Sequence, residues 1–238
     1  RSSAASDVYK RQDVILKPVK NLITIDGPSG VGKGTLAFSL AEKLGWNVLD
    51  SGLIYRLVGY ITLEEELKTS NEITRFINNS EIELLTNFKK RICEIKIDSK
   101  LIGDELRNEE VASKASELAK NPKIRKEIVQ IQRKAYDEDI GLIADGRDMG
   151  TVIFPEAILK VFLQASPEIR AKRRAKQLRE KGMNVIMHDL LELIKQRDEE
   201  DTKRNFSPLK QAEEALMIDT TNLSIKEVEN KVLEYFER

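Results

Sequence analysis

The sequence is poor in the residues that several kinds of functional site require. Among its 238 residues it has one cysteine, Cys93, and one histidine, His188. A single cysteine excludes a disulfide within the chain and fits a reducing compartment. A single histidine excludes metal sites that use several histidines and argues against a Ser-His-Asp triad. A catalytic site must therefore rely on other side chains.

Net charge and long apolar segments are also missing. Lys and Arg total 40, as do Asp and Glu, so the formal net charge at pH 7 is zero, and aromatic residues make up 5% of the chain. This composition lacks the basic field and the stacking aromatics of nucleic-acid-binding proteins, so we expect no nucleic-acid partner. No apolar run approaches the ~20 residues that a bilayer-spanning helix needs. We expect a soluble, cytoplasmic protein with no membrane partner.

The first residues differ from the rest. Residues 1–12 show no apolar periodicity, do not begin with Met and lack the apolar centre of a signal peptide. We interpret them as a leader that is not part of the fold, with a naturally disordered N-terminus as the alternative. We expect a single domain over residues 20–238.

The stretch at residues 26–35, DGPSGVGKGT, predicts a phosphate-binding loop. It follows an apolar run at 22–25 and precedes a helical pattern at 36–44, which is the strand–loop–helix context of a P-loop. Glycines let successive backbone N–H groups point at a polyphosphate, the helix adds its positive end, and Lys33 adds a point charge. The residues predicted to bind ATP are Gly27, Pro28, Ser29, Gly30, Val31, Gly32, Lys33, Gly34 and Thr35.

This loop departs from the usual P-loop at one position. Gly34 stands between Lys33 and the hydroxyl residue Thr35, as in the loop of nucleoside monophosphate kinases. The hydroxyl ligand for Mg²⁺ is displaced by one residue. Asp145 ends a hydrophobic strand, as an acid that organises Mg²⁺ does in P-loop proteins. We therefore predict Thr35 and Asp145 as metal ligands, directly or through water.

Alternation of apolar runs with helical patterns predicts an α/β fold. A parallel sheet wrapped by helices on both faces is expected from five short runs, at 22–25, 46–50, 141–145, 158–163 and 215–219. Ligands of such sheets bind at the carboxyl ends of the strands. Residues 91–98 alternate apolar and charged side chains and pair with 82–85 and 100–102 in a small antiparallel insertion. A basic helix is expected at 168–181 and another at 190–204, with Asp189 as its cap.

Two loops at predicted strand ends carry side chains suited to binding a second anion, the acceptor of a phosphoryl group. Ser51 offers a hydroxyl and a helix cap, and Arg56 offers a planar fork for a phosphate, although a plain capped turn is the alternative. Arg147 and Asp148 stand at the mouth of the third strand. An Arg and a carboxylate complement the acceptors and the N4 amine of cytosine, with an ordinary ion-paired turn as the alternative.

Two helices carry clustered arginines. Arg197, Asp201 and Arg204 share one helix face, and a second group consists of Arg170, Arg173 and Arg174. Solvated ion pairs are the alternative interpretation. Beside a P-loop, such arginines fit phosphoryl transfer between two anions. No catalytic base stands out, although two aspartates, Asp50 and Asp148, remain possible bases.

Three motifs together resemble bacterial cytidylate kinases: residues 26–35, 50–56 and 145–155. The pattern Arg197-Asp198-x-x-Asp201-x-x-Arg204, followed by 207–209, is also similar, and the likeness extends over about 21–238. The resemblance implies ATP-dependent phosphorylation of CMP or dCMP with Mg²⁺ by a monomer. It also implies a P-loop kinase core with a monophosphate-binding insertion at 75–108 and a helical lid at 170–186, both closing over the substrates.

The resemblance also assigns roles to residues. It implies that the acceptor phosphate is held by Ser51, Arg56, Arg147 and Arg204, and that the ribose is held by Arg197 and Asp201. Cytosine would be read by Ser116, Arg125 and Asp148, of which Ser116 and Arg125 have no signal of their own in the sequence. Arg174, with Arg170 or Arg173, would reach ATP from the lid. The implied catalytic residues are Lys33, Arg147, Arg204 and Arg174.

The sequence leaves two alternatives open. A nucleoside monophosphate kinase of other base specificity is allowed by the Gly-Lys-Gly-Thr loop but disfavoured by the motif at 145–151. A P-loop switch protein would be expected to carry a guanine-specifying Asn-Lys-x-Asp motif, which the sequence lacks.

Overall fold

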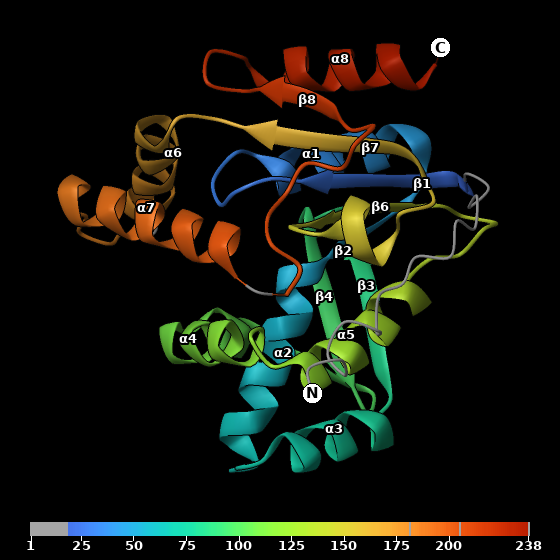
Figure 1. Cartoon of the computed structure of the whole chain (residues 1–238), viewed down its shortest axis with the longest axis vertical. Coiled ribbons are helices and arrows are strands. Elements are labelled where there is room, and N and C mark those ends of the chain that lie inside the picture. Colours follow the sequence, from blue (N-terminus) through green and yellow to red (C-terminus); the bar gives the residue numbers. More distant parts are fainter. Residues whose placement is uncertain (1–18, 181, 205, 238) are drawn as a thin grey trace, which may run out of the picture.

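A computed structural model describes residues 19–180, 182–204 and 206–237. The predicted leader at 1–12 lies outside the described residues. Within them, no helix is long and apolar enough to cross a membrane. Figure 1 shows a sheet with helices against it, two helices projecting from one side, and a further group of helices with a second sheet below.

The predicted five-stranded parallel sheet is confirmed. Its strand order is β2-β6-β1-β7-β8, and each neighbouring pair is parallel. The strands are β1 (Val19–Asp26), β2 (Asn47–Asp50), β6 (Leu142–Gly146), β7 (Ala157–Gln164) and β8 (Leu216–Asp219). Their apolar runs are continuous because helices bury the sheet on both sides.

Two apolar clusters sandwich this sheet. Ile23 and Ile25 of β1 pack with α1 (Lys33–Leu44) and α8 (Ile225–Phe236). Leu22 belongs to the other cluster, which includes residues of α2 (Ser51–Glu64) and α5 (Pro122–Lys134). Successive side chains of a strand point to opposite faces, so one short run supplies both clusters. Gly45 ends α1 in the left-handed conformation expected of a helix C-terminus.

The predicted antiparallel insertion is also present. It consists of β3 (Ile82–Asn87), β4 (Ile92–Ile97) and β5 (Lys100–Ile102), followed by a short 3₁₀ turn, η2 (Asp104–Arg107). Before it lies a helix that we did not predict, α3 (Ser70–Asn79). Its start has a capping box, in which Thr69 and Glu72 each accept from the other's backbone N–H. That pattern is readable in the sequence.

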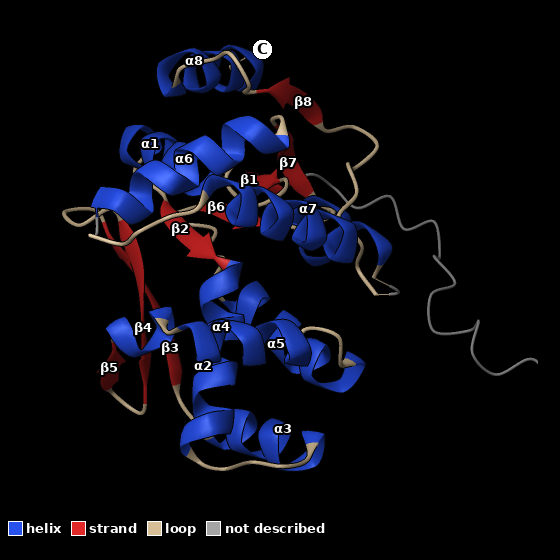
Figure 2. Cartoon of the chain, turned by 90° about the vertical axis from the view of Figure 1, so that its left-hand side faces the viewer, coloured by secondary structure: helices blue, strands red, loops and turns tan. Residues whose placement is uncertain are grey.

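Two helix caps differ from those expected from the sequence. Asp50, not Ser51, caps α2, because its carboxylate accepts from the N–H groups of Gly52 and Leu53. Asp189 lies in the first turn of α7 (Met187–Lys203), whose N-cap position is Ile186. The elements not yet described are α4 (Glu109–Leu118), α6 (Pro167–Glu180) and a π-helical turn, η3 (Met149–Ile153). Figure 2 shows α6 and α7 lying beside the sheet, above the group that contains α2 to α5.

The strand register brings the predicted motif loops together. Asp26 of β1 lies opposite Gly146 of β6, and Asp50 of β2 lies opposite Asp145. The P-loop, the Asp50 loop and the Asp145 loop therefore leave the same edge of the sheet, as expected for parallel strands.

Candidate active site

A cavity of about 670 Å³ lies where these three loops meet. It is also lined by α4, α5 and the later part of α7. All nine residues predicted to bind the acceptor line it: Ser51, Arg56, Ser116, Arg125, Arg147, Asp148, Arg197, Asp201 and Arg204. Ser29, Gly30, Lys33 and Asp145 line the same cavity, so the P-loop borders the cavity of the predicted acceptor-binding residues.

The backbone of the P-loop is fixed by close packing. Gly27 has a φ of 149°, and a Cβ there would overlap the carbonyl oxygen of Leu163 in β7. Lys33 Nζ donates to the Pro28 carbonyl at 3.1 Å and lies 3.7 Å from Asp145 Oδ1. Burial lowers the pKa of Lys33 and raises the pKa of Asp145, although each side chain attracts the other. An arriving polyphosphate would interact with an amine that has little water around it.

A second cavity of about 440 Å³ lies on the other side of the loop. It is lined by Gly30, Gly32, Thr35 and the basic pair Arg173 and Arg174. Of the predicted ATP-binding residues, Gly30, Val31, Gly32, Thr35 and Arg174 thus border this second cavity. Its position beyond the loop suits the nucleoside end of a triphosphate whose phosphates lie on the loop.

Two of the three predicted arginines of α6, Arg173 and Arg170, bind other parts of the protein. Arg173 donates to the carbonyl and the hydroxyl of Thr220, at 2.6 and 3.1 Å. Arg170 is 2% exposed and lines neither cavity. Its guanidinium donates to the Ser29 carbonyl at 3.2 Å and to both carboxylate oxygens of Asp198. Arg170 therefore ties α7 to the P-loop.

The arginines predicted to hold the acceptor phosphate lie in different environments. Arg56 donates to the Leu106 carbonyl at 2.9 Å, and burial lowers its pKa. Arg147 Nε lies 2.6 Å from Asp201 Oδ2. Burial lowers the pKa of Arg147, but Asp201, together with Asp145 and Asp26, more than offsets this and leaves the pKa raised. Arg204 lies at the C-cap of α7, where its extended backbone leaves the helix, and not on the helix face that we expected.

A buried ion pair marks the predicted base-reading side. Arg125 of α5 and Asp148 after β6 are hydrogen bonded, with side chains 7% and 6% exposed. The Arg125 guanidinium also lies 5.6 Å from the ring centre of Tyr55, at cation–π distance. Burial raises the pKa of Tyr55 to about 12, so this phenol stays neutral at physiological pH. A charged pair out of water is costly unless it is well bonded, which favours a functional role here.

The residues present are compatible with Mg²⁺. Among the described residues, no group of three or more His, Cys, Asp or Glu side chains is arranged to hold a metal. That is no obstacle for Mg²⁺, which is usually held by one or two carboxylates together with substrate phosphates and water. The Asp145 carboxylate lies beside Gly34, since a Cβ there would be 3.5 Å from Asp145 Oδ2.

Several residues of the site had no assignment from the sequence. Tyr55 lies inside the second motif but offers no periodic or pairing signal. Thr220 follows β8, and its hydroxyl lies 3.2 Å from both the Val31 and Gln164 carbonyls. Asp26 is the first residue of the P-loop stretch, and the sequence predicts no role for it. Such contacts join distant segments, so local patterns do not reveal them.

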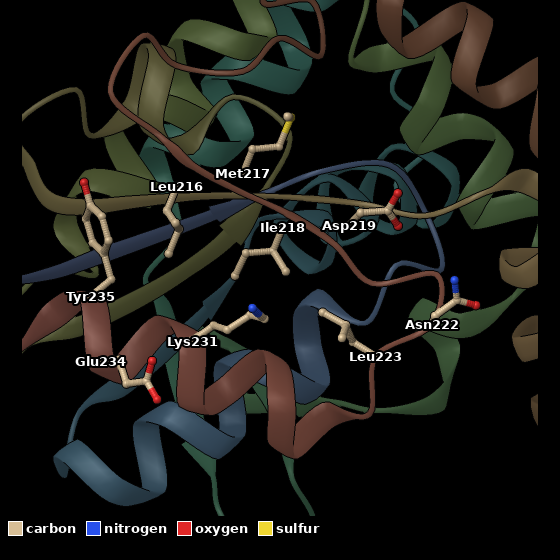
Figure 3. A pocket seen from close by; sticks show the side chains of 9 residues that line it. All are labelled: Leu216, Met217, Ile218, Asp219, Asn222, Leu223, Lys231, Glu234 and Tyr235. Carbon is tan, nitrogen blue, oxygen red and sulfur yellow. The ribbon is translucent and has the colours of Figure 1, made fainter.

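Another cavity, of about 640 Å³, lies away from the three motif loops, between β8 and α8 (Figure 3). Its lining includes Met217, Asp219, Lys231 and Tyr235 and contains no arginine and none of the predicted site residues. The two cavities beside the P-loop, and not this one, are therefore the candidate substrate-binding sites.

Comparison with known proteins agrees with this geometry. A family model described as cytidylate kinase matches residues 23–238. The chain belongs to the cytidylate kinase family. Cytidylate kinase from Pasteurella multocida is 46% identical over 221 residues, which cover 92% of this chain and 96% of that protein. Cytidylate kinase from Stutzerimonas stutzeri is 45% identical with the same coverage.

Comparison with solved structures supports the α/β fold of this member of the cytidylate kinase family. An uncharacterized protein from Eubacterium ventriosum superposes with a TM-score of 0.51 at 14% identity, covering 92% of this chain and 98% of that one. At that identity the match concerns the fold alone. The family assignment rests on the sequence relatives, and the roles of single residues in the site stay predictions.

Proposed function

We propose that this chain transfers the γ-phosphate of ATP to CMP or dCMP, giving ADP and CDP or dCDP. The observation that carries the proposal is the single cavity that joins Lys33 of the P-loop to a cluster of arginines and to the Asp148–Arg125 pair. Its relatives are cytidylate kinases over nearly the whole chain. ATP is therefore the co-substrate.

The arginines would hold donor and acceptor phosphates together. On the acceptor side we assign Ser51, Arg56, Arg147 and Arg204 to the phosphate of CMP. On the donor side Lys33 and Arg174 reach the transferred group from the P-loop and from α6. These cations offset the repulsion between two anions and stabilise the equatorial oxygens of the transferred phosphoryl group. A phosphate acceptor is already an anion at pH 7, so the reaction needs no general base.

Base and ribose would be bound in the same cavity. The Asp148 carboxylate accepts from the N4 amine of cytosine, while Arg125 and Ser116 serve its ring acceptors. Uracil presents an oxygen at the N4 position, so the carboxylate repels it. Arg197 and Asp201 are assigned to the ribose. In this arrangement Lys33 sets the rate and the pocket around Asp148 sets the choice of base.

We assign Mg²⁺ to the site between Thr35 and Asp145, held directly or through water. When bound, Mg²⁺ neutralises charge on the β- and γ-phosphates. Thr35 borders the second cavity and Asp145 the first, so the two residues lie on the two sides of the loop that would hold those phosphates.

We further propose that segments 75–108 and 170–186 move over the substrates, which would exclude water from the γ-phosphate. In the structure the first segment contains the antiparallel sheet, and the second begins in α6. The chain acts as a cytoplasmic monomer in this proposal.

A coupled ADP assay with ATP and Mg²⁺ across CMP, dCMP, UMP and AMP tests the activity. CMP and dCMP should give strong acceptor-dependent ADP formation. If AMP or UMP works well while CMP does not, the chain is a kinase of other base specificity. If ADP forms slowly without any acceptor, the chain is a switch-type nucleotidase.

A further inference from the structure

The turn that follows Asp148 has an unusual cap. Asp148 occupies the N-cap position of η3, where an aspartate side chain normally accepts from the second or third backbone N–H of the turn. In the described part of the chain, no N–H of this turn donates to the Asp148 side chain. Its carboxylate is bonded to Arg125 instead. Another acceptor must therefore serve the first N–H groups of the turn.

That acceptor is Asp26, which lies more than 120 residues earlier, at the end of β1. The Met149 N–H donates to Asp26 Oδ1 at 2.9 Å, and the Gly150 N–H donates to Oδ2 at 2.8 Å. Asp26 is 3% exposed and lines neither cavity beside the P-loop. Its carboxylate therefore lies behind the loop, outside both cavities.

Packing around Gly150 makes this contact possible. A Cβ at Gly150 would lie 2.8 Å from Thr24 Oγ1 and 3.2 Å from Lys160 Cγ. Only a residue without a side chain lets the turn approach β1 closely enough for both hydrogen bonds. The same close approach fixes Asp148, the residue immediately before the turn.

We propose that Asp26 is a positioning residue for base selection: it caps the turn in place of Asp148 and so leaves the Asp148 carboxylate free to pair with Arg125 and read cytosine. The inference rests on the proposed function, because it assumes that Asp148 reads the base. It also links the start of the P-loop physically to the base-reading side of the cavity.

The decisive variant is Asp26→Asn. Burial raises the pKa of Asp26 to about 7, so the kinetics are measured at pH 8, where Asp26 is ionised. Asparagine keeps the shape but has one acceptor oxygen where the carboxylate has two, so one backbone N–H loses its partner and attracts Asp148. We expect the ratio of kcat/KM for CMP over UMP to fall about tenfold, through a higher KM for CMP. The KM for ATP should change less than twofold, because Lys33, Arg170 and Arg173 hold the P-loop carbonyls independently.

A matched control separates positioning from general stability. Glu229 is also a buried, hydrogen-bonded carboxylate, 6% exposed, but it pairs with Ser39 and Lys43 between α8 and α1. Glu229→Gln should lower the unfolding temperature and leave the CMP/UMP ratio unchanged. Gly150→Ala should shift the ratio in the same direction as Asp26→Asn, because it moves the turn away from β1.

A double variant gives the sharpest test. If Asp26 acts through Asp148, Asp26→Asn combined with Asp148→Asn should show the same CMP/UMP ratio as Asp148→Asn alone. A wild-type ratio in folded Asp26→Asn, or fully multiplicative losses in the double variant, would overturn the inference. Failure of the wild-type protein to prefer CMP would instead overturn the proposed function, so the two failures are distinguishable.

Discussion

The Asp201 carboxylate holds the Arg147 guanidinium, with 2.6 Å between Oδ2 and Nε, although the residues come from α7 and from the loop after β6. Arg204 Nη1 lies 3.9 Å from the other oxygen of the same carboxylate. One acid on α7 therefore sets the position of an arginine that we assign to the acceptor phosphate.

Asp201→Asn should weaken acceptor binding more than donor binding. Losing a charge-assisted hydrogen bond removes on the order of 1.5–3 kcal/mol, so we expect the KM for CMP to rise about tenfold or more, with the KM for ATP within about twofold. Steady-state kinetics with each substrate varied measures both constants. Glu199→Gln, which removes an exposed ion pair with Lys203 on the same helix, is the control and should change neither.

Lys33→Met should reduce kcat strongly. The lysine amine lies in the P-loop beside Asp145, and a preorganised cation at the transferred group typically contributes 10²–10³-fold, which is about the loss that we expect. The CMP/UMP ratio should stay unchanged, because the base-reading residues lie on other elements. A changed ratio with a normal kcat would contradict the division of roles between Lys33 and Asp148.

Asp198→Asn should destabilise the protein and weaken ATP binding together. Arg170, whose side chain is 3% exposed, would lose its charged partner, which costs about 2–3 kcal/mol for a pair with one partly exposed member. Arg170 also holds the Ser29 carbonyl, so the KM for ATP should rise while the KM for CMP stays near its normal value. Chemical unfolding and kinetics provide the two readouts, with Glu192→Gln on the exposed side of α7 as the control. An unchanged KM for ATP in a destabilised variant would show that Arg170 does not support the loop.

Asp26 should make stability depend on pH. Burial raises its pKa from 3.8 to about 7; Asp148 adds to this effect, and Lys33 and the two backbone N–H groups oppose it. Between about pH 4 and 7 the unfolded chain has released this proton while the folded chain keeps it, so this contribution to stability falls as pH rises and levels off above 7.

Urea unfolding of the wild-type protein and of Asp26→Asn from pH 5 to 8 measures this contribution. The free energy of unfolding of the wild type, relative to the variant, should fall by roughly 2–3 kcal/mol between pH 5 and 7. Parallel pH profiles for the two proteins would contradict the raised pKa of Asp26.

The sequence predicted most of the fold because the signals concerned are local. The P-loop lies between an apolar run and a helical pattern, and the alternation at 91–98 is visible within eight residues. The predicted helix caps were less accurate, because Asp50 and not Ser51 caps α2, and Asp189 does not cap α7. We also did not predict α3 from the sequence, despite its Thr69–Glu72 capping box. Several polar residues near a helix start compete for one position, and the packing of the chain decides between them.

The sequence alone determined the strands of both sheets, the phosphate-binding loop and the family motifs, because these depend on residue types at fixed spacing. Ser116 and Arg125 had no signal of their own and were named only through the resemblance. Tertiary structure decided that they line one cavity with Asp148, that Arg170 is buried against Asp198, and that Asp26 caps the turn after Asp148. Each of these contacts joins segments far apart in the chain, and a hydrogen bond between such segments exists only once packing has set their distance.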